Sequence, residues 1–453
     1  MSQYQRKSVS GETCSAYVEK LSRMISCKTV WTYNGENAGE FDRFYGDVES
    51  LFPNLAAKAK KLTFGGGCFV YVIEGKNATK NVMLMSHHDV VDGSPDWTTD
   101  PFTPVEKDGY LYGRGTIDTK TPLFAQLQAA EELLAAGHTF EGINLYIGSS
   151  NNEEVCGDGM VLAAEYFKKE GIRFHAVFDE GGAITEGQIP GVKRKSAVVA
   201  VHEKSRHVVR CSAAIDAKGL GGFGGSKDSA TERLSRFITE VSDKKDKIYK
   251  GRFYPEVRAT FERHVPDMAF PMNVLFGNMG LFAPVIRKIM MGIPAASAML
   301  STGLSFTTIT AGDTREPQIR AKTAETTLFL RCVREEDLYA GLEKIRKIGE
   351  KYGVTIEEVS RDYCQPTDFN GEAYKTVEAL LHENFPDVVV VPFLLTAGTD
   401  ARHFTDVADH ILRFAPIDLN KKQFAAIHAA DEHIGIANVG ECVVFYKDLI
   451  RRI

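Results

Sequence analysis

The sequence lacks the features that mark several large classes of protein. Its 453 residues contain no run near the roughly 18 apolar residues that a membrane-spanning helix needs. The first residues, MSQYQRK, lead into polar sequence without the apolar core of a signal peptide. The eight cysteines are scattered, without a CxxC pair, which indicates reduced thiols rather than a disulfide framework. We therefore expect a cytoplasmic protein with no membrane partner.

A surplus of one charge and a phosphate-binding loop are also missing. The 54 Lys and Arg residues are intermixed with the 60 Asp and Glu residues, which gives a formal net charge of -6 without a dominant run of either sign. Because nucleic-acid binding needs clustered basic residues, we expect no nucleic-acid partner. The glycines Gly65–Gly67 precede a predicted strand rather than a helix, which favours a turn over a phosphate loop.

Both ends of the chain show strands alternating with helices. Apolar runs predict strands at Phe69–Ile73, Val82–Met85 and Ile143–Ile147, and we expect the first two to be neighbours. Helical spacing of apolar residues predicts helices at Thr121–Ala136 and Gly159–Lys169. This alternation is typical of an α/β/α sandwich around a mainly parallel sheet.

The middle of the chain has a different order of elements. Between residues 204 and 363 we expect a strand, a helix, two strands, a helix and a strand, a small α+β open sandwich of the ferredoxin-like kind. We therefore predict a catalytic domain of residues 1–203 and 364–453, with an inserted lid or dimerisation domain of residues 204–363. Its apolar, helical segment near 246–303 either packs against its own domain, a dimer partner or the active-site mouth, which we favour, or faces a membrane.

Polar side chains follow several of the predicted strands. His87 and Asp89 end the strand at Val82–Met85, and period-2 geometry points them to one side, so the carboxylate can orient the imidazole. Asp118 follows in GRGTIDTK, and a pair of glutamates comes after the strand at 143–147. Imidazole and carboxylate are zinc ligands, so these strand ends predict a metal site.

Seven short motifs occur in order along the chain: SHHDVV, WTTDPF, GRGTIDTK, NNEE, FDEGG, GTDARHF and HAADE. In this order they resemble the co-catalytic dinuclear zinc exopeptidase and aminoacylase family. That family includes carboxypeptidase S, glutamate carboxypeptidase, aminoacylase, carnosinase and succinyl-diaminopimelate desuccinylase. The resemblance runs from about residue 14 to 450 and is strongest to the branch of carboxypeptidase S and the N-acyl-amino-acid hydrolases.

The resemblance implies a site with two zinc ions, with Co²⁺ or Mn²⁺ as alternatives. The implied metal ligands are His87, Asp118 as the bridge between the ions, Glu154, Asp179 and His428. Glu153 would be the general base that takes a proton from the attacking water, and Asp89 would orient His87. Arg402 would grip the free carboxylate of the substrate through its guanidinium fork, unless it forms an ordinary surface salt bridge.

Two positions near these ligands leave a choice. Asp179 and Glu180 compete for one ligand position, and the closer branch of the family favours Asp179. His88 is adjacent to His87 but points the other way along the strand, so we leave it out of the ligand set.

Two segments of the inserted domain depart from the family pattern. Gly219–Ser226 lacks the histidine that reaches across a dimer in family members to stabilise the oxyanion, and His202 and His207 are candidates to replace it. The region Ala311–Ile319 lacks a customary asparagine. Because losing one oxyanion donor typically costs about 2.7–4 kcal/mol, we expect an unusual substrate or a slow enzyme.

These observations predict a dinuclear zinc metallohydrolase that cleaves an amide bond next to a free carboxylate. We favour a carboxypeptidase or dipeptidase that acts on short peptides. An N-acyl-amino-acid amidohydrolase is the alternative within this class, and a metal-binding relative with little or no catalysis is the alternative from another class. The habit of the family suggests a homodimer formed through the lid domain.

Overall fold

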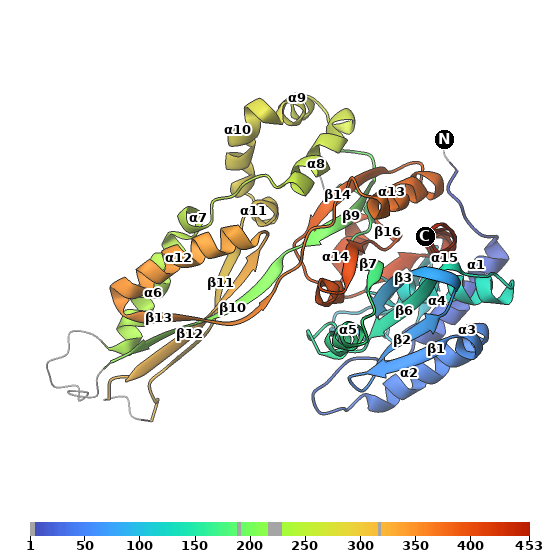
Figure 1. Ribbon diagram of the computed structural model, residues 1–453, viewed down its shortest axis with the longest axis horizontal. Helices are drawn as coiled ribbons and strands as arrows, with labels where there is room; N and C mark the ends of the chain where they lie inside the picture. The colour runs from blue at the N-terminus through green and yellow to red at the C-terminus, as the bar shows by residue number, and fades with distance from the viewer. Residues whose placement is uncertain (1–4, 188–191, 216–228, 316–318) are drawn as a thin grey trace. The chain divides into compact units, whose positions relative to one another are not determined.

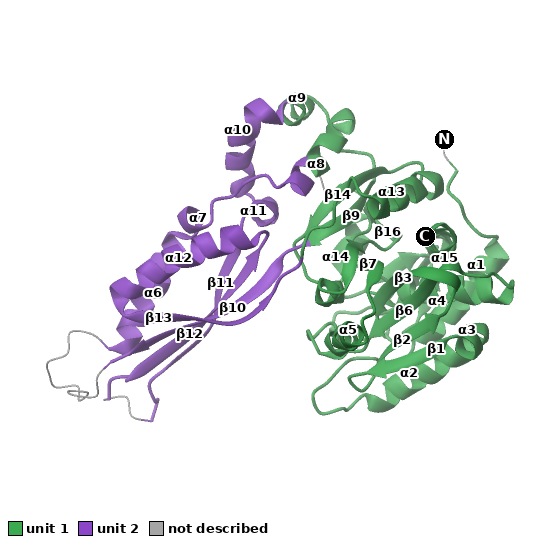
Figure 2. Cartoon of the chain, in the orientation of Figure 1, with its two compact units in different colours: residues 1–202, 259–277, 365–453 green, residues 203–258, 278–364 purple. Residues whose placement is uncertain are grey.

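The computed structural model describes residues 5–187, 192–215, 229–315 and 319–453. The chain divides into two compact units, which are coloured separately in Figure 2. Unit 1 consists of residues 1–202, 259–277 and 365–453, and unit 2 of residues 203–258 and 278–364. Figure 1 labels most of the elements of both units.

Unit 1 is built around a ten-stranded mixed sheet with the order β1-β2-β6-β3-β7-β15-β9-β8-β16, in which β14 pairs with β9. The strands are β1 (Lys60–Phe64), β2 (Cys68–Ile73), β3 (Lys76–His87), β6 (Glu141–Ser150), β7 (Phe174–Asp179), β8 (Ile184–Thr185), β9 (Ser196–Glu203), β14 (Val389–Leu395), β15 (Ala408–Arg413) and β16 (Asp418–Leu419). In the centre, β3 runs parallel to β6 and β7, and β7 runs parallel to β15. The carboxyl ends of these strands therefore meet at one edge of the sheet.

One prediction about the order of the strands is wrong. Strands β2 and β3 are consecutive in sequence but not neighbours, because β6 lies between them, antiparallel to β2 and parallel to β3. The link between β2 and β3 passes close against β6: a Cβ atom on Gly75 would lie 1.8 Å from the carbonyl oxygen of Ile143. A glycine therefore lets the chain cross the end of β6 where any side chain would collide with it.

Helices cover both faces of this sheet. One face carries α1 (Gly11–Ile25), α2 (Ala38–Leu51), α3 (Pro53–Lys58), α4 (Lys120–Ala135), α13 (Glu372–Asn384) and α15 (Ile436–Arg452), and the other carries α5 (Gly159–Lys169) and η2 (Asp400–Phe404). Alternate residues of β3 enter different cores: Val82 and Leu84 pack on the first face, Met83 and Met85 on the second. A strand buried on both faces reads as a continuous apolar run, as this one does.

Unit 2 contains a four-stranded antiparallel sheet with the order β11-β12-β10-β13. The strands are β10 (Ser205–Ala214), β11 (Gly303–Ala311), β12 (Thr323–Cys332) and β13 (Val354–Asp362), and the helices packed against them are α6 (Ala230–Asp243) and α12 (Glu335–Tyr352). Val209 and Cys211 of β10 form one core with Leu234 and Leu342 of the two helices. The structure thus confirms an α/β sandwich interrupted by a smaller α+β open sandwich.

The apolar segment near 246–303 is helical. It forms α7 (Lys245–Ile248), α8 (Pro255–His264), η1 (Val265–Asp267), α9 (Met272–Gly277), α10 (Met279–Met291) and α11 (Pro294–Leu300). We predicted the whole segment in the inserted domain, but residues 259–277 belong to unit 1. The reason is a set of contacts far apart in sequence: the Thr260 hydroxyl donates to the carbonyl oxygen of Pro392, and Arg263 pairs with Glu378.

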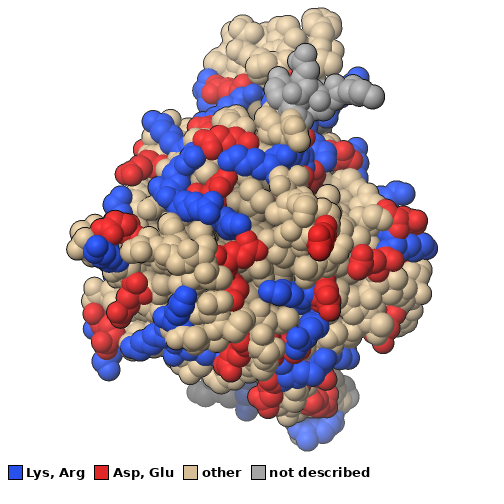
Figure 3. All heavy atoms as spheres, turned by 90° about the vertical axis from the view of Figure 1, so that its right-hand side faces the viewer, with Lys and Arg blue, Asp and Glu red and all other residues tan. Residues whose placement is uncertain are grey.

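Charged residues of both signs are exposed on one face of the molecule. On the face shown in Figure 3, Lys and Arg side chains are interspersed with Asp and Glu side chains. Across the described parts of the chain, every helix is too short or too polar to cross a bilayer.

Candidate metal centre

Four of the sequence motifs meet in unit 1, at the carboxyl ends of the central strands. His87 is the last residue of β3, and its partner in the parallel register is Ser150, the last residue of β6. Glu154 follows β6 within a few residues, and Asp118 lies just before α4. His428 comes from the segment before α15. The parallel pairing of β3 and β6 explains why two of these motifs share one edge of the sheet.

Asp118 lies between two histidines from distant parts of the chain. Its Oδ1 is 3.0 Å from Nε2 of His87, and its Oδ2 is 2.9 Å from Nε2 of His428. The same His428 nitrogen is 3.1 Å from Oε2 of Glu154. One potential ligand atom from each of His87, Asp118 and Glu154 lies within 4.8 Å of the other two. Imidazole nitrogen and carboxylate oxygen form the donor set that zinc prefers in catalytic sites.

The carboxylates of this cluster favour charged histidines. Burial alone would lower the pKa of His87, but hydrogen bonds to Asp118 and Asp89 raise it well above its ordinary value. Hydrogen bonds to Asp118 and Glu154 raise the pKa of His428 to about 10. In return, the two histidines lower the pKa of Asp118 despite its burial. Because metal ligation needs neutral imidazole, a cation that binds here must displace these protons.

Asp89 holds both His87 and the segment that carries the two glutamates. The Nδ1 atom of His87 is 2.9 Å from the backbone oxygen of Asp89 and 3.5 Å from its Oδ1. The Asp89 carboxylate accepts hydrogen bonds from the backbone N–H of Glu153 at 3.1 Å and of Glu154 at 3.0 Å. Oε1 of Glu154 is buried and accepts no hydrogen bond from any described residue, which leaves its lone pairs for a cation.

Glu153 has the electrostatic environment of a general acid–base group. Burial raises the pKa of its carboxyl well above the ordinary value, and the negative charges of Asp400, Glu180 and Asp89 raise it further against the opposing effect of His87. A carboxyl group whose pKa is raised by burial holds a proton more readily than an exposed one, as a general acid–base group must.

Asp179 and Glu180 differ in what their carboxylates contact. Asp179 ends β7, and its Oδ1 and Oδ2 accept hydrogen bonds from the backbone N–H of Glu180 and Ala401, both at 2.9 Å. Burial raises the pKa of the Glu180 carboxyl well above its ordinary value, and the charges of Asp179, Asp118 and Glu154 add to this while His87 opposes it. The charges of the cluster therefore act on Glu180, whereas Asp179 is held by main-chain amides.

Arg402 lies in η2, and its side chain points into the protein rather than over the surface. The residue is 5 % exposed, and its Nη1 donates a hydrogen bond of 2.7 Å to the backbone oxygen of Thr399. Its neighbour Asp400 has its pKa raised to about 7 by burial, although the Arg402 charge acts in the opposite direction. The binding of a substrate carboxylate by Arg402 stays a prediction.

His88 is turned away from the metal cluster, as its place in the strand suggests. Its ring stacks on Phe44 and Phe69 with centroid distances of 4.9 and 5.4 Å. Its Nδ1 is 2.8 Å from the Ser149 hydroxyl, and burial lowers its pKa well below the ordinary value. His88 is therefore a packed, neutral side chain of the core.

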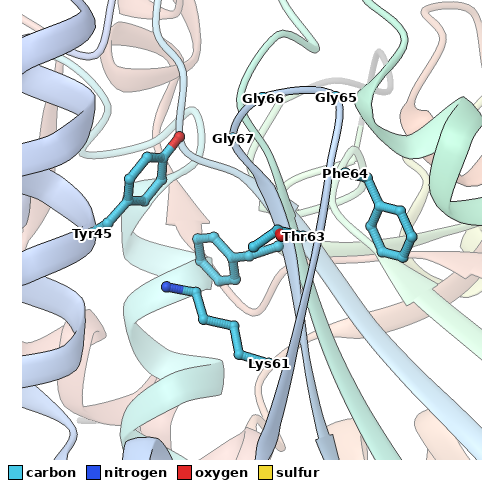
Figure 4. A pocket seen from close by; sticks show the side chains of 8 residues that line it. Tyr45, Lys61, Thr63, Phe64, Gly65, Gly66 and Gly67 are labelled. Carbon is cyan, nitrogen blue, oxygen red and sulfur yellow. The ribbon is translucent and has the colours of Figure 1, made fainter.

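The three glycines noted in the sequence form the turn of the β1–β2 hairpin (Figure 4). A pocket of about 300 Å³ lies beside this turn and is lined by Tyr45, Lys61 and Phe69 among others. The Lys61 ammonium pairs with Glu49 at 2.8 Å and lies over the Tyr45 ring. Because the turn joins two strands and the nearby cation already has a partner, nothing here supports a phosphate loop.

The two departures from the family pattern stay predictions. Gly219–Ser226 lies outside the described residues, and so do residues 316–318 of the second region. His207, one candidate replacement for the missing histidine, is buried in β10, and neither of its ring nitrogens has a hydrogen-bond partner among the residues described.

Comparison with known proteins identifies relatives over nearly the whole chain. Residues 83–452 match Peptidase family M20/M25/M40. The chain is 27% identical over 444 residues to the N-fatty-acyl-amino acid synthase/hydrolase PM20D1 of Xenopus tropicalis, covering 96% of this chain and 85% of that protein. It is 26% identical over 452 residues to the probable carboxypeptidase S-like 2 of Dictyostelium discoideum, again covering 96% of this chain and 85% of the relative.

Solved structures share the fold. The M20 family metallo-carboxypeptidase Sso-CP2 of Sulfolobus solfataricus superposes with a TM-score of 0.65 at 18% identity, covering 96% of this chain and 98% of that one. Human carnosine dipeptidase 1 gives a TM-score of 0.59 at 14% identity, covering 97% of both chains. With the match over residues 83–452, these findings show that the chain belongs to peptidase family M20/M25/M40, as a metallohydrolase that acts on amide C–N bonds.

Proposed function

We propose that this protein is a dinuclear zinc hydrolase that cleaves an amide bond next to a free carboxylate, in a short peptide or an N-acyl amino acid. The observation that carries the proposal is the position of Asp118, with one oxygen toward His87 and the other toward His428. A carboxylate shared in this way between two histidines has the arrangement required of a ligand that bridges two cations.

The side chains fit a pair of divalent ions. Asp118 would be shared, His428 and Glu154 would hold one ion, and His87 with one further carboxylate would hold the other. Asp179 and Glu180 are the two candidates for that last carboxylate: each Asp179 oxygen accepts one main-chain hydrogen bond and keeps a second lone pair for a cation, while the charges of Asp118 and Glu154 act on Glu180. Zinc suits this mixture of nitrogen and oxygen donors, and Co²⁺ and Mn²⁺ are the alternatives.

The catalytic role that we assign to Glu153 is supported by its place next to Glu154 in the chain and by the raised pKa of its buried carboxyl. Two cations bound beside it would make a water molecule more acidic and polarise the scissile carbonyl. Glu153 takes the proton of the attacking water and gives it to the leaving nitrogen as the C–N bond breaks. Asp89 supports this step because it fixes the backbone N–H of Glu153 and the ring of His87. A protein that only binds metal needs no such base, which argues against a non-catalytic function.

The substrate is expected to carry a free carboxylate, which Arg402 would bind through its guanidinium group. The names of the relatives support both substrate classes, since one is an N-fatty-acyl-amino acid synthase/hydrolase and another a probable carboxypeptidase S-like protein. Peptides with a free C-terminus and N-acyl amino acids both carry that carboxylate beside an amide bond. The same site could therefore bind and hydrolyse substrates of either class.

We further propose a homodimer formed through unit 2. Strand β11 lies at an edge of the four-stranded sheet, and its sequence GLSFTTITA contains no charged residue. An uncharged edge strand offers its main-chain groups for pairing with another strand. The opposite edge, β13, carries charged residues such as Glu357 and Glu358, which discourage such pairing.

The cytoplasmic location stays a prediction.

Hydrolysis of a mixed substrate panel tests the proposed activity. The panel contains dipeptides and N-acyl amino acids, each paired with its C-terminal amide, and mass spectrometry reads the products. We expect cleavage that is confined to free carboxylates, lost with a chelator and restored by zinc. No cleavage of any substrate by zinc-loaded protein would contradict the proposed function, and equal cleavage of the amides would remove the role of Arg402.

A further inference from the structure

We propose that Glu432 is a positioning residue for the metal centre: it holds the main chain of the Asp118 loop and joins that loop to the segment that carries His428. The inference rests on the proposed function, because it concerns the same metal site. Glu432 is the last residue of the HAADE motif, and neither the motif nor the cluster geometry assigns it a role.

The Glu432 carboxylate is completely enclosed and accepts four hydrogen bonds. The residue is 0 % exposed. Its Oε1 accepts from the backbone N–H of Ile117 at 2.6 Å and of Asp118 at 3.1 Å. Its Oε2 accepts from the backbone N–H of Gly115 at 3.0 Å and from Nη1 of Arg114 at 2.7 Å. An ionised carboxylate has about four lone-pair sites, so the four donors use the full accepting capacity of the Glu432 carboxylate.

Arg114 links the Glu432 carboxylate to the main chain next to His428. Its side chain is 1 % exposed and its guanidinium group lies over the Trp97 ring, 5.2 Å from the centroid. While Nη1 binds Glu432, Nη2 donates a hydrogen bond of 3.0 Å to the backbone oxygen of Ala429. Ala429 directly follows His428. The Arg114–Glu432 pair therefore connects the Asp118 loop with the HAADE segment at Ala429 and at Glu432.

This connection matters because Asp118 must face two histidines at once. A displacement of its main chain would lengthen the contacts to His87 and His428 together. His428 itself has a φ angle of 58°, in the left-handed region that non-glycine residues seldom adopt, so surrounding contacts must hold its segment. A residue that binds the N–H of Asp118 and sits in the His428 segment controls the relative position of these two ligands.

The substitution Glu432→Gln tests the proposal with little change in volume. The amide oxygen can replace one carboxylate oxygen, but the amide NH₂ then faces other donors, because all four partners of Glu432 donate. We expect the affinity for Zn²⁺, measured at a temperature far below unfolding by competition with a chromophoric chelator, to fall about 10–100-fold. We also expect kcat to fall and KM to change little, because the substrate-binding groups are untouched.

Glu131→Gln is the matched control. Glu131 is also a buried carboxylate of unit 1 that accepts main-chain hydrogen bonds, from Asn54 at 3.2 Å and Leu55 at 2.8 Å, but these partners belong to the start of α3. The same chemical change should lower thermal stability there without changing the affinity for zinc. A loss of affinity confined to Glu432→Gln supports positioning, and an equal loss in both variants overturns it.

A second variant applies if Glu432→Gln does not fold. Arg114→Lys keeps a cation beside Glu432 but removes the hydrogen bond from Nη2 to Ala429. We expect a smaller but measurable loss of zinc affinity, and affinity equal to that of the unsubstituted protein would overturn the proposal. If the unsubstituted protein fails to bind two zinc ions, this result contradicts the proposed function and overturns the positioning role as well. Two ions bound equally well by the unsubstituted protein and by Glu432→Gln overturn the positioning role alone.

Discussion

Asp118 and His428 share a hydrogen bond of 2.9 Å although they lie far apart in the sequence. The contact exists because the C-terminal part of the chain returns to the sheet that the N-terminal part begins, so that β15 pairs with β7. The metal centre therefore forms only when the parts of unit 1 that precede and follow unit 2 in the sequence fold together. Ligands that are this far apart in sequence are brought together only by the complete fold.

Removing the proposed general base should separate catalysis from metal binding. We expect Glu153→Gln to lower kcat by about 10²–10⁴-fold, the usual contribution of a positioned acid–base group. Zinc content should stay near that of the unsubstituted protein, because Glu153 is not among the proposed ligands. Initial rates and elemental analysis of the same preparation measure both quantities. Full activity in this variant would refute the proposed mechanism.

The choice between Glu180 and Asp179 can be made with a pair of variants. If Glu180 is the ligand, Glu180→Gln should weaken the binding of one of the two zinc ions, because the charges of Asp118 and His87 act on its carboxyl. Asp179→Asn should then mainly lower thermal stability, because its oxygens accept the N–H of Glu180 and Ala401. Metal titration and thermal unfolding distinguish the two effects. The reverse result would restore Asp179 as the ligand.

Substitution of Arg402 should affect substrates according to their charge. Hydrogen bonds to charged groups contribute about 1.5–3 kcal/mol, so Arg402→Met should lower kcat/KM for free carboxylates by roughly 10- to 100-fold. The matched C-terminal amides should be affected far less. Steady-state kinetics on both members of each substrate pair provides the measurement. An equal loss on both would mean that Arg402 supports the fold rather than the substrate.

The stability of the metal-free protein should depend on pH through its histidines. His428 has its pKa raised to about 10 from an ordinary value near 6.5, and that of His87 is raised as well. Such groups contribute stability that is fully present below the unfolded pKa and is lost as pH rises through the folded pKa. Chelated protein should therefore unfold at lower temperatures as pH increases from about 6.5 to 10. His428→Asn should flatten this dependence in thermal scans, and an unchanged slope would contradict the assigned cause.

Assembly through β11 can be tested by adding a charge to this strand. Ile309 lies in β11 with 61 % of its surface exposed, so Ile309→Lys should favour the monomer, because charged side chains protect edge strands from pairing. Val359→Lys, in the opposite edge strand β13 and 50 % exposed, is the control and should leave the assembly unchanged. Light scattering measures the mass of each variant. A dimer that survives Ile309→Lys would place the interface elsewhere.

Much of the metal cluster could be predicted because its ligands follow recognisable strands. His87 and Glu154 follow apolar strands within a few residues, and parallel strands place such residues at one edge. The order of the strands could not be predicted, because β6, which lies between β2 and β3, comes much later in the sequence than either of them. Asp179 and Glu180 are adjacent at a strand end, where alternation cannot decide which carboxylate meets the cluster.

The role of Glu432 at the metal centre could not be predicted from the sequence for a related reason. A glutamate in a polar loop resembles a surface residue in sequence, since its type is seldom fully buried. Its burial follows from donors supplied by Arg114, Gly115, Ile117 and Asp118, all far away along the chain. No local pattern records that relationship. The one feature of the sequence that pointed to Glu432 was its place as the last residue of the HAADE motif.

The most direct test of the dinuclear hydrolase is a titration of metal-free protein with Zn²⁺, in which bound zinc and hydrolysis of an N-acyl amino acid or dipeptide are measured on the same samples. We predict saturation at two zinc ions per chain and full activity only when both are bound, with Asp118→Asn unable to hold the pair. Full activity at one zinc ion per chain, or an Asp118→Asn variant that still binds two ions and turns over substrate, would contradict it.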